Sequence, residues 1–308
     1  MNGSALIAVH HHVRRKQLEL PALIALAVFR AAIGLGIVSV DGWGSKHKLT
    51  HSGEFRLWLF LIAAQTALWA IGAAFLLAPE VRRPVEDYWV AARRHVVASV
   101  IAAAIPLVAF VAYASLSSHL DYPFPDHPYK VLALSLIGSC VALIGVAELA
   151  LVKFALESGH AGGRSADVKR YLALRALLQR VLTVQGAIVG AAALSAGALR
   201  NAVVAYTGHK SSFPREYVLL YGAFFTLLLA VWYTPVYLKL LEVGRANLEA
   251  ACPLEEPKSP GWLPAYEKRK KLEEHLQLEV ATSASFRAGV AILAPLASAL
   301  VALLLGAA

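Results

Sequence analysis

The sequence predicts an all-α integral membrane protein with seven transmembrane helices, the N-terminus in the cytoplasm and the C-terminus outside. Three observations lead to this fold class. Hydrophobic residues make up 58% of the 308 residues and charged residues 16%, with a mean hydropathy of +0.59, whereas soluble domains are about 25% charged. The apolar residues are gathered in seven long runs. The cations are concentrated in alternate connections between those runs.

Each apolar run is about 20 residues long, which is enough for one helix to cross a hydrocarbon core of about 30 Å. The seven predicted spans are 20–40, 57–78, 96–116, 131–152, 181–199, 217–238 and 288–308. Together they predict a single transmembrane helical bundle over residues 1–308. The first run is full length and contains Arg30, and no small-residue cleavage site follows it, so we expect it to stay in place as a signal anchor.

The orientation follows from the placement of Lys and Arg. Most of them lie in the N-terminal segment and in the connections after the second, fourth and sixth runs, and the positive-inside rule places these segments in the cytoplasm. The net charge of +9 is therefore attributed to topology and not to nucleic-acid binding. The expected partners are the lipid bilayer and either further copies of the chain or other membrane subunits. The expected location is the plasma (inner) membrane of a bacterium, as a multi-pass protein.

The connection 239–285 is the one long polar segment in the sequence. After a Pro-rich turn, Tyr266, Leu272, Leu276 and Val280 are spaced as one apolar stripe, and the neighbouring charges are spaced for i,i+4 pairs. With about 45 residues, the segment is too short for an independent domain. We expect a cytoplasmic loop with an amphipathic coupling helix that leads straight into the last span. A helix lying on the membrane surface is the alternative.

Small residues recur on one face of several spans, where they allow another helix to approach closely. The residues concerned in the fifth and seventh spans are Gly186, Gly190, Ala193, Gly197, Ala291, Pro295, Ser298 and Ala302. Tight packing is the expected role, and a narrow path lined by small residues is the alternative. The sixth span is strongly aromatic, and its Phe224 and Phe225 lie deep enough to form a gate or a ligand wall.

Glu148 is the one acidic residue inside a long apolar run, and a carboxylate there needs a partner or a function. It lies about 7 Å from the inner end of its helix, at the level of Arg180, whereas Arg30 lies near mid-membrane and can snorkel inward. We expect Arg180 as its partner, with Arg30 second. The polar cluster would be completed by Gln65, Gln179 and Gln185. The pair either fixes helix packing or provides a titrating or ion-coordinating carboxylate on a transport path.

The external connections are rich in His. If the first connection is helical, His47, His51 and Glu54 share one face, and His119 and His127 belong to the second connection. Imidazole and carboxylate at this spacing are suited to Zn²⁺ or another transition metal. The alternatives are proton sensing by the imidazoles, or ordinary loop residues that bind nothing.

No HExxH, GxSxG or P-loop motif occurs in the sequence. The absence of these motifs disfavours an enzyme but does not exclude one. No catalytic residue is predicted, and no cofactor is expected apart from the transition metal considered above. The favoured function is a channel or transporter-like protein that moves a small ion or solute, with Glu148, Arg180 and Arg30 as the intramembrane charges. One alternative is a structural or assembly subunit of a larger membrane complex. The other is a metal-dependent membrane protein that uses His47, His51, His119 and His127.

Overall fold

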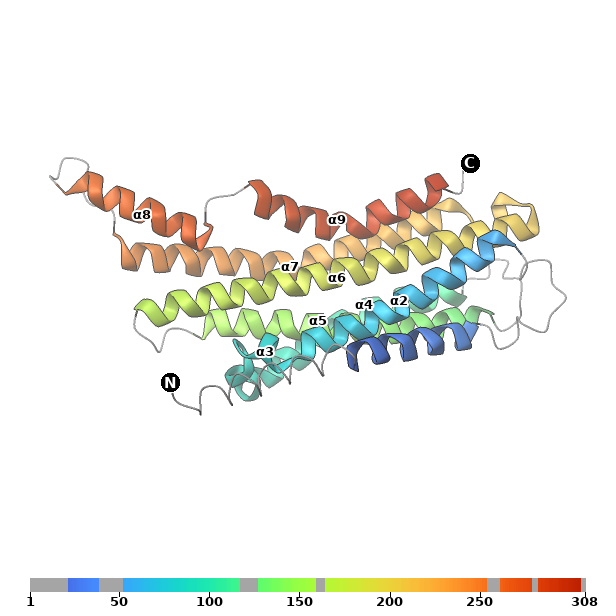
Figure 1. Cartoon of the computed structure of the whole chain (residues 1–308), viewed down its shortest axis with the longest axis horizontal. Coiled ribbons are helices and arrows are strands. Elements are labelled where there is room, and N and C mark those ends of the chain that lie inside the picture. Colours follow the sequence, from blue (N-terminus) through green and yellow to red (C-terminus); the bar gives the residue numbers. More distant parts are fainter. Residues whose placement is uncertain are drawn as a thin grey trace, which may run out of the picture.

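The computed structural model describes residues 22–38, 52–116, 127–158, 164–253, 261–278 and 282–305. These residues are 94% helical and include no strand. The helices are Ala22–Val38, α2 (Gly53–Leu77), α3 (Pro79–Arg82), η2 (Glu86–Tyr88), α4 (Trp89–Leu116), α5 (His127–Glu157), α6 (Arg164–Thr207), η3 (Lys210–Ser212), α7 (Arg215–Ala251), α8 (Trp262–Leu276) and α9 (Thr282–Leu305). The long helices lie side by side in one elongated bundle (Figure 1).

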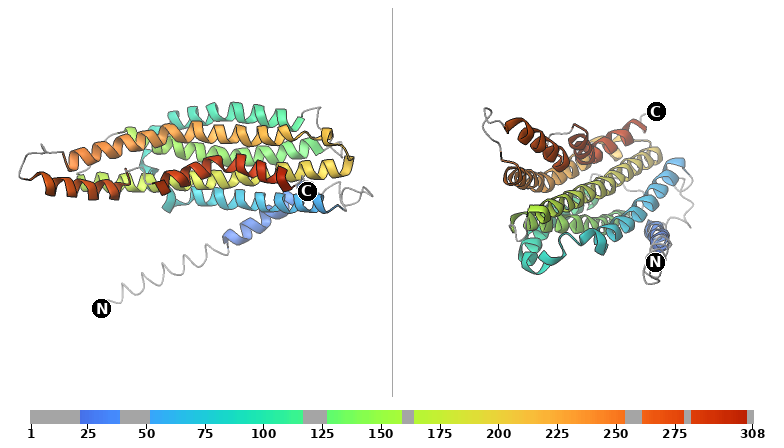
Figure 2. Two further views of the ribbon diagram at one scale, coloured as in Figure 1. Left: turned by 90° about the horizontal axis from the view of Figure 1, so that it is seen from above. Right: turned by 60° about the vertical axis from the view of Figure 1, so that its left-hand side comes forward.

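Successive long helices run in opposite directions, so the bundle has two distinct ends. The basic end holds α3 and η2, the ends of α5 and α7, and α8 (Figure 1). The η3 end, at the opposite side, holds the turn between α6 and α7 and the first turns of α2 and α5. At the basic end, α7 and α8 form a hairpin that extends beyond the other helices (Figure 2).

Among the described residues, five helices are long and apolar enough to cross a membrane, as in a multi-pass membrane protein. They are α2, α4, α5, α6 and α7, and the other two predicted runs lie in the shorter apolar helices Ala22–Val38 and Ala288–Leu304. With 44 and 37 residues, α6 and α7 are about 66 and 55 Å long at 1.5 Å per residue. Both therefore reach well beyond a hydrocarbon core of about 30 Å.

α6 is the central helix of the bundle. Of its most apolar stretch 61% is buried, against 39% or less for the other four long helices, and it packs on α2, α5, α7 and α9. Glycine permits the close approach to α9, because a Cβ atom at Gly186 would collide with the backbone of Ala291, and one at Gly197 with Ala302. The small-residue faces predicted for the fifth and seventh spans thus pack on each other within the chain.

Gln185 links α6 to α5 in the middle of the bundle. Its Nε2 atom donates a hydrogen bond to the backbone carbonyl of Ala142 at 3.3 Å. Gly145 leaves the space for this side chain, because a Cβ atom at that position would overlap the Gln185 amide. Buried polar groups need such partners, so the glycine and the glutamine act as a pair.

The connection after the sixth apolar run differs from the prediction where it approaches the last span. α7 continues to Ala251, so residues 239–251 form the end of the helix that begins in the sixth apolar run. α8 ends at Leu276, where Gln277 has a φ of 53°. A left-handed residue at this position terminates an α-helix. The coupling helix therefore does not lead straight into α9.

The apolar stripe predicted for the coupling helix is present in part. Leu272 and Leu276 pack into the core of the basic end. Tyr266 is exposed and stacks on Trp262 with 5.3 Å between ring centroids, while Val280 lies outside the described residues. The hairpin therefore has a packed side near the bundle and an aromatic tip away from it.

Two arginines stabilise the α7–α8 hairpin by donating hydrogen bonds to carbonyl groups at the C-terminal ends of α7 and α8. Arg175 of α6 is buried, and its Nη1 atom donates to the carbonyl oxygens of Leu276 and Gln277 at 2.8 and 2.9 Å. The last carbonyls of a helix lack helical donors, and a cation there also complements the helix dipole. Arg269 of α8 donates in the same way to the carbonyl of Cys252, at the end of α7, at 2.7 Å. The hairpin is thus docked on α6 as one unit.

Candidate functional site

The buried carboxylate predicted from the sequence lies at the basic end. The side chain of Glu148 on α5 is 2% exposed, and its Oε1 atom is 2.9 Å from Nε of Arg82, whose side chain is 30% exposed. Arg82 is the last residue of α3. Its guanidinium also lies over the ring of Trp89, 5.4 Å from the centroid. The partner of Glu148 is therefore supplied by the short connection between α2 and α4.

The prediction that Arg180 or Arg30 pairs with Glu148 is wrong. Both arginines are exposed on the outer faces of their helices. A shared depth along two helices does not make two side chains meet, because each must also point toward the other. The predicted polar cluster does not form either, since its three glutamines lie apart: Gln185 bonds to α5, Gln179 is exposed, and Gln65 is buried in the other half of the bundle.

Packing around the ion pair closes the basic end. Arg170 of α6 lies over the ring of Tyr88 at 4.8 Å and donates a hydrogen bond to the carbonyl of Ala155 on α5. α3 and η2 are thereby held against α5 and α6. Fully buried aliphatic side chains fill the space between these helices, among them Leu76, Val85, Leu151, Val152, Leu178 and Val181.

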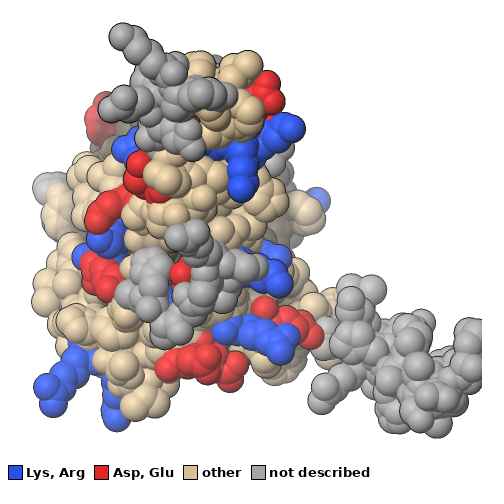
Figure 3. Space-filling model, turned by 90° about the vertical axis from the view of Figure 1, so that its left-hand side faces the viewer, with Lys and Arg blue, Asp and Glu red and all other residues tan. Residues whose placement is uncertain are grey.

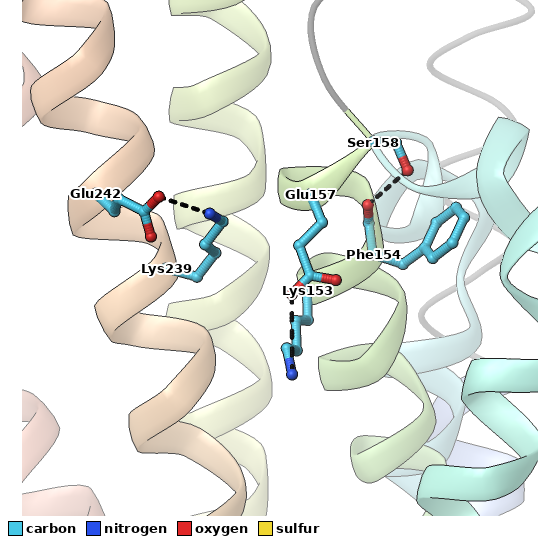
Figure 4. A network of polar contacts seen from close by, with 6 residues as sticks. All are labelled: Lys153, Phe154, Glu157, Ser158, Lys239 and Glu242. Atoms are coloured by element: carbon cyan, nitrogen blue, oxygen red, sulfur yellow. Dashed lines mark hydrogen bonds and ion pairs between the residues drawn. The ribbon is translucent and has the colours of Figure 1, made fainter.

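Charges on the outside of the basic end form local pairs. Lys153 lies 3.8 Å from Glu157 on α5, and Lys239 lies 2.7 Å from Glu242 on α7 (Figure 4). Exposed pairs one helical turn apart contribute about 0.3 to 0.5 kcal/mol each. Viewed from this end, acidic and basic side chains are interspersed over the surface (Figure 3). We regard these exposed pairs as a solvated surface and not as a site.

At the η3 end, in contrast, the bundle is hollow. A cavity of about 850 Å³, part of it open to solvent, lies between α2, α4, α5, α6 and α7. Most of the wall is apolar or aromatic, and it includes Trp58, Val111, Leu134, Phe213 and Tyr221. An apolar wall with a few polar groups is typical of a site for a small molecule.

The polar side chains that the described residues contribute to the cavity wall are all uncharged. They are Gln65, Tyr113, Ser115, Ser135, Ser195, Tyr217 and Tyr221. Gln65 is 6% exposed and Ser195 is 4% exposed. Among the described residues, neither Gln65 Oε1 nor Ser195 Oγ has a hydrogen-bond partner. Because an unpartnered buried polar atom costs about 1 to 3 kcal/mol, these two atoms are favourable points for a ligand to bind.

Aromatic side chains join α4 and α7 beside the cavity. Phe110 of α4, which lines the cavity, stacks on Phe224 of α7 with 3.9 Å between ring centroids. Phe225 is buried and packs edge-on against Phe224 at 5.3 Å. The two phenylalanines predicted as a gate or ligand wall thus lie next to the cavity, although the residues that line it directly are Phe110 and Tyr221.

His127 is the one member of the predicted metal group that lies within the described residues. It is buried, and its ring centroid is 5.2 Å from that of Trp58 in the cavity wall. His47, His51 and His119 lie outside the described residues. Within the part of the chain that the structure describes, no three His, Cys, Asp or Glu residues are grouped as metal ligands. The external metal site therefore stays a prediction.

The sequence contained a partial signal for the cavity. Gln65 and Ser195 are polar residues inside apolar runs, and such residues commonly face the interior of a bundle. Their convergence depends on how five helices are arranged, which no single run reveals. No protein-family model, curated protein or solved structure matches the chain.

Proposed function

We propose that the chain is a transporter-like protein of the bacterial plasma membrane that moves a small uncharged solute. In this proposal it crosses the membrane seven times, with Ala22–Val38 and α9 as the first and last spans, and the N-terminus is cytoplasmic. The basic end then faces the cytoplasm, in accord with the positive-inside rule. The observation that carries the proposal is the contrast between the hollow η3 end and the closely packed basic end.

The lining of the cavity selects the charge of the solute. An ionised group that leaves water needs a partner of opposite charge, because its desolvation costs several kcal/mol. None of the described lining residues is Asp, Glu, Lys, Arg or His. An uncharged molecule, in contrast, can use the free hydrogen-bonding atoms of Gln65 and Ser195. We therefore favour a neutral solute over an ion.

The ion pair at the basic end acts in this proposal as the inner closure. A path to the cytoplasm requires α3 and η2 to move, which takes Arg82 away from Glu148. A buried carboxylate that loses its cation is strongly unfavourable. Opening is therefore accompanied by protonation of Glu148 or by entry of water to it. Glu148→Gln removes this requirement, and we expect the variant to move the solute without dependence on pH.

Uptake into proteoliposomes tests the proposal. The probes are ¹⁴C-labelled nicotinamide, urea and glycerol as uncharged solutes, and ⁸⁶Rb⁺ as an ion. We expect faster uptake of at least one uncharged solute than in empty liposomes, and no added ⁸⁶Rb⁺ uptake. Ala196→Trp, in the cavity wall, should abolish the effect, whereas Ala223→Trp, on the outer face of α7, should preserve it. Uptake of ⁸⁶Rb⁺ alone would favour an ion channel, and no uptake of any probe would contradict transport.

Cysteine labelling in intact cells tests the proposed orientation. After replacement of Cys140 and Cys252, single cysteines are introduced at Lys210, at the η3 end, and at Ser158, at the basic end. A membrane-impermeant maleimide should label the cysteine at 210 and not the one at 158. The reverse pattern would invert the orientation.

A second candidate, an assembly subunit, is favoured by the tip of the α7–α8 hairpin. Leu263 and Tyr266, in the first turns of α8, are exposed beside Trp262. The α7–α8 hairpin extends beyond the ends of the other helices (Figure 2). Ala251 lies 13 residues past the end of the sixth predicted span, or about 20 Å along α7, so in this proposal lipid does not cover the tip. If the tip binds another subunit, Leu263→Glu should reduce the mass of the native complex in blue native electrophoresis, and an unchanged mass would argue against this function.

A further inference from the structure

The cavity has a lateral mouth between α4 and α7. Among its described lining residues, two are exposed: Tyr113 of α4 at 57% and Leu220 of α7 at 50%. The remaining lining residues are buried or half-buried. The mouth is therefore at the place where these two helices face each other.

Along the helix axes, the mouth lies between two aromatic contacts. The side chains of Tyr113 and Tyr217 interact on the side nearer the η3 end. Phe110 and Phe224 stack on the side nearer the basic end. The two contacts are three residues apart on α4 and seven apart on α7, or about 5 and 10 Å at 1.5 Å per residue. Leu220 lies between the two contacts on α7.

The surface around the mouth is apolar. On α4, Ile101, Ile105 and Val108 are exposed on the approach to Tyr113. On α7, the exposed side chains that follow Leu220 are Leu227 and Val231. Exposed apolar stripes on membrane-spanning helices face lipid. A molecule reaches this mouth most directly from the hydrocarbon phase.

From this geometry we propose that the ligand is a lipid-soluble, uncharged molecule that enters the cavity sideways between α4 and α7. It has an aromatic or acyl body, which contacts the walls, and one O–H or N–H group, which donates to Gln65 Oε1. The Ser195 hydroxyl donates to an acceptor on the same molecule where one is present. This inference rests on the proposed function, since it assigns the solute class and the entry route of the same cavity.

Pro106 gives α4 a point at which the mouth can widen. It lies inside the helix, four residues before Phe110, and a proline removes the backbone donor of that turn and bends the helix. The segment after Pro106 carries both Phe110 and Tyr113. A small change of the bend therefore separates both aromatic contacts together while the rest of α4 stays packed on α5.

The test uses N-phenyl-1-naphthylamine, an uncharged aromatic amine with one N–H group. Its binding to the protein in lipid nanodiscs is followed by energy transfer from tryptophan, since Trp58 lies in the cavity wall. We expect saturable binding, and Gln65→Leu should weaken it about five- to tenfold because the N–H loses its acceptor. The same change removes an unpartnered buried polar atom, so the thermal midpoint should be unchanged or higher. The anion 1-anilinonaphthalene-8-sulfonate should show no Gln65-dependent binding.

The entry route is tested by the rate of binding. Leu220→Trp narrows the mouth and should slow association at least severalfold with little change in affinity. Leu227→Trp, on the same face of α7 and also exposed, should leave the rate unchanged. Equal rates for both variants would overturn the lateral route, and absence of Gln65-dependent binding would overturn the ligand class. Both results are independent of the uptake of nicotinamide, urea and glycerol, so the failure of this inference is distinguishable from failure of the proposed transport.

Discussion

Replacement of Arg82 by glutamine removes the cation that the structure places against Glu148. The carboxylate stays on the packed face of α5, 2% exposed, among aliphatic side chains. Glutamine can still offer a hydrogen bond, but it supplies no charge. We therefore expect Arg82→Gln to destabilise the folded state far more than the loss of an exposed ion pair.

The magnitude follows from the distance and the exposure. Two unit charges about 4 Å apart interact with about 4 kcal/mol at an effective dielectric constant of about 20. Because Arg82 is 30% exposed, solvent screens part of this interaction. Removal of one partner from a fully buried pair costs about 3 to 5 kcal/mol. For Arg82→Gln we expect the lower end of that range, about 3 kcal/mol.

A double-mutant cycle measures this interaction. The wild type, Arg82→Gln, Glu148→Gln and the double variant are unfolded by titration with SDS in mixed micelles and followed by near-ultraviolet circular dichroism. The double variant should be more stable than the sum of the two single losses implies, by about 1 to 3 kcal/mol. Lys239→Gln, which breaks an exposed pair of similar length, serves as the control, with an expected loss of about 0.5 kcal/mol or less.

The reasoning would be refuted by either of two results. In the first, Arg82→Gln costs no more than Lys239→Gln. In the second, the effects of Arg82→Gln and Glu148→Gln add without any coupling. Either result would mean that the carboxylate does not depend on Arg82, and the role of the pair as an inner closure would be lost with it.

Two further predictions concern helix contacts. Arg175→Met removes the donors from the last carbonyls of α8, so hydrogen exchange in the last turn of α8 should accelerate about tenfold or more, while Arg180→Met, on the exposed side, should change nothing. Gly145→Ala should lower stability by about 1 to 3 kcal/mol, because the added methyl group displaces Gln185. Gly36→Ala, which meets no atom within 4 Å, should raise stability by about 0.5 to 1 kcal/mol through helix propensity; SDS titration measures both, and equal signs would contradict the packing argument.

The helical architecture could be predicted because hydropathy and small-residue spacing are properties of single segments. Each apolar run forms a helix wherever it is described, since backbone groups in a membrane must be satisfied within the segment. The contact between α6 and α9 follows from the same logic, because Gly186 and Gly197 leave room that only a closely packed helix fills. For this contact, the spacing of small residues in the sequence is enough to predict the close packing of the two helices.

The partner of Glu148 could not be predicted because it depends on rotation about a helix axis and on the path of a connection. Arg175 and Arg180 are five residues apart, or about 140° around α6, and one is buried while the other is exposed. Position along the helix axis alone does not show which of the two arginines is buried. Arg82 was assigned to a loop by its position between two runs, and only the folded connection brings it back to α5. The cavity escaped prediction for the same reason, since five helices form it.

The uninterrupted course of α6 has a mechanical consequence. Arg175 holds the end of α8, and Ser195, twenty residues further along the same helix, forms part of the cavity wall. The two positions are about 30 Å apart on one stiff rod. A displacement of the hairpin is therefore transmitted along α6 to the cavity wall, because α6 is one continuous helix between the two positions. A molecule that binds α8 would therefore change the shape of the cavity about 30 Å away. A molecule that binds in the cavity and widens it would in turn displace the hairpin.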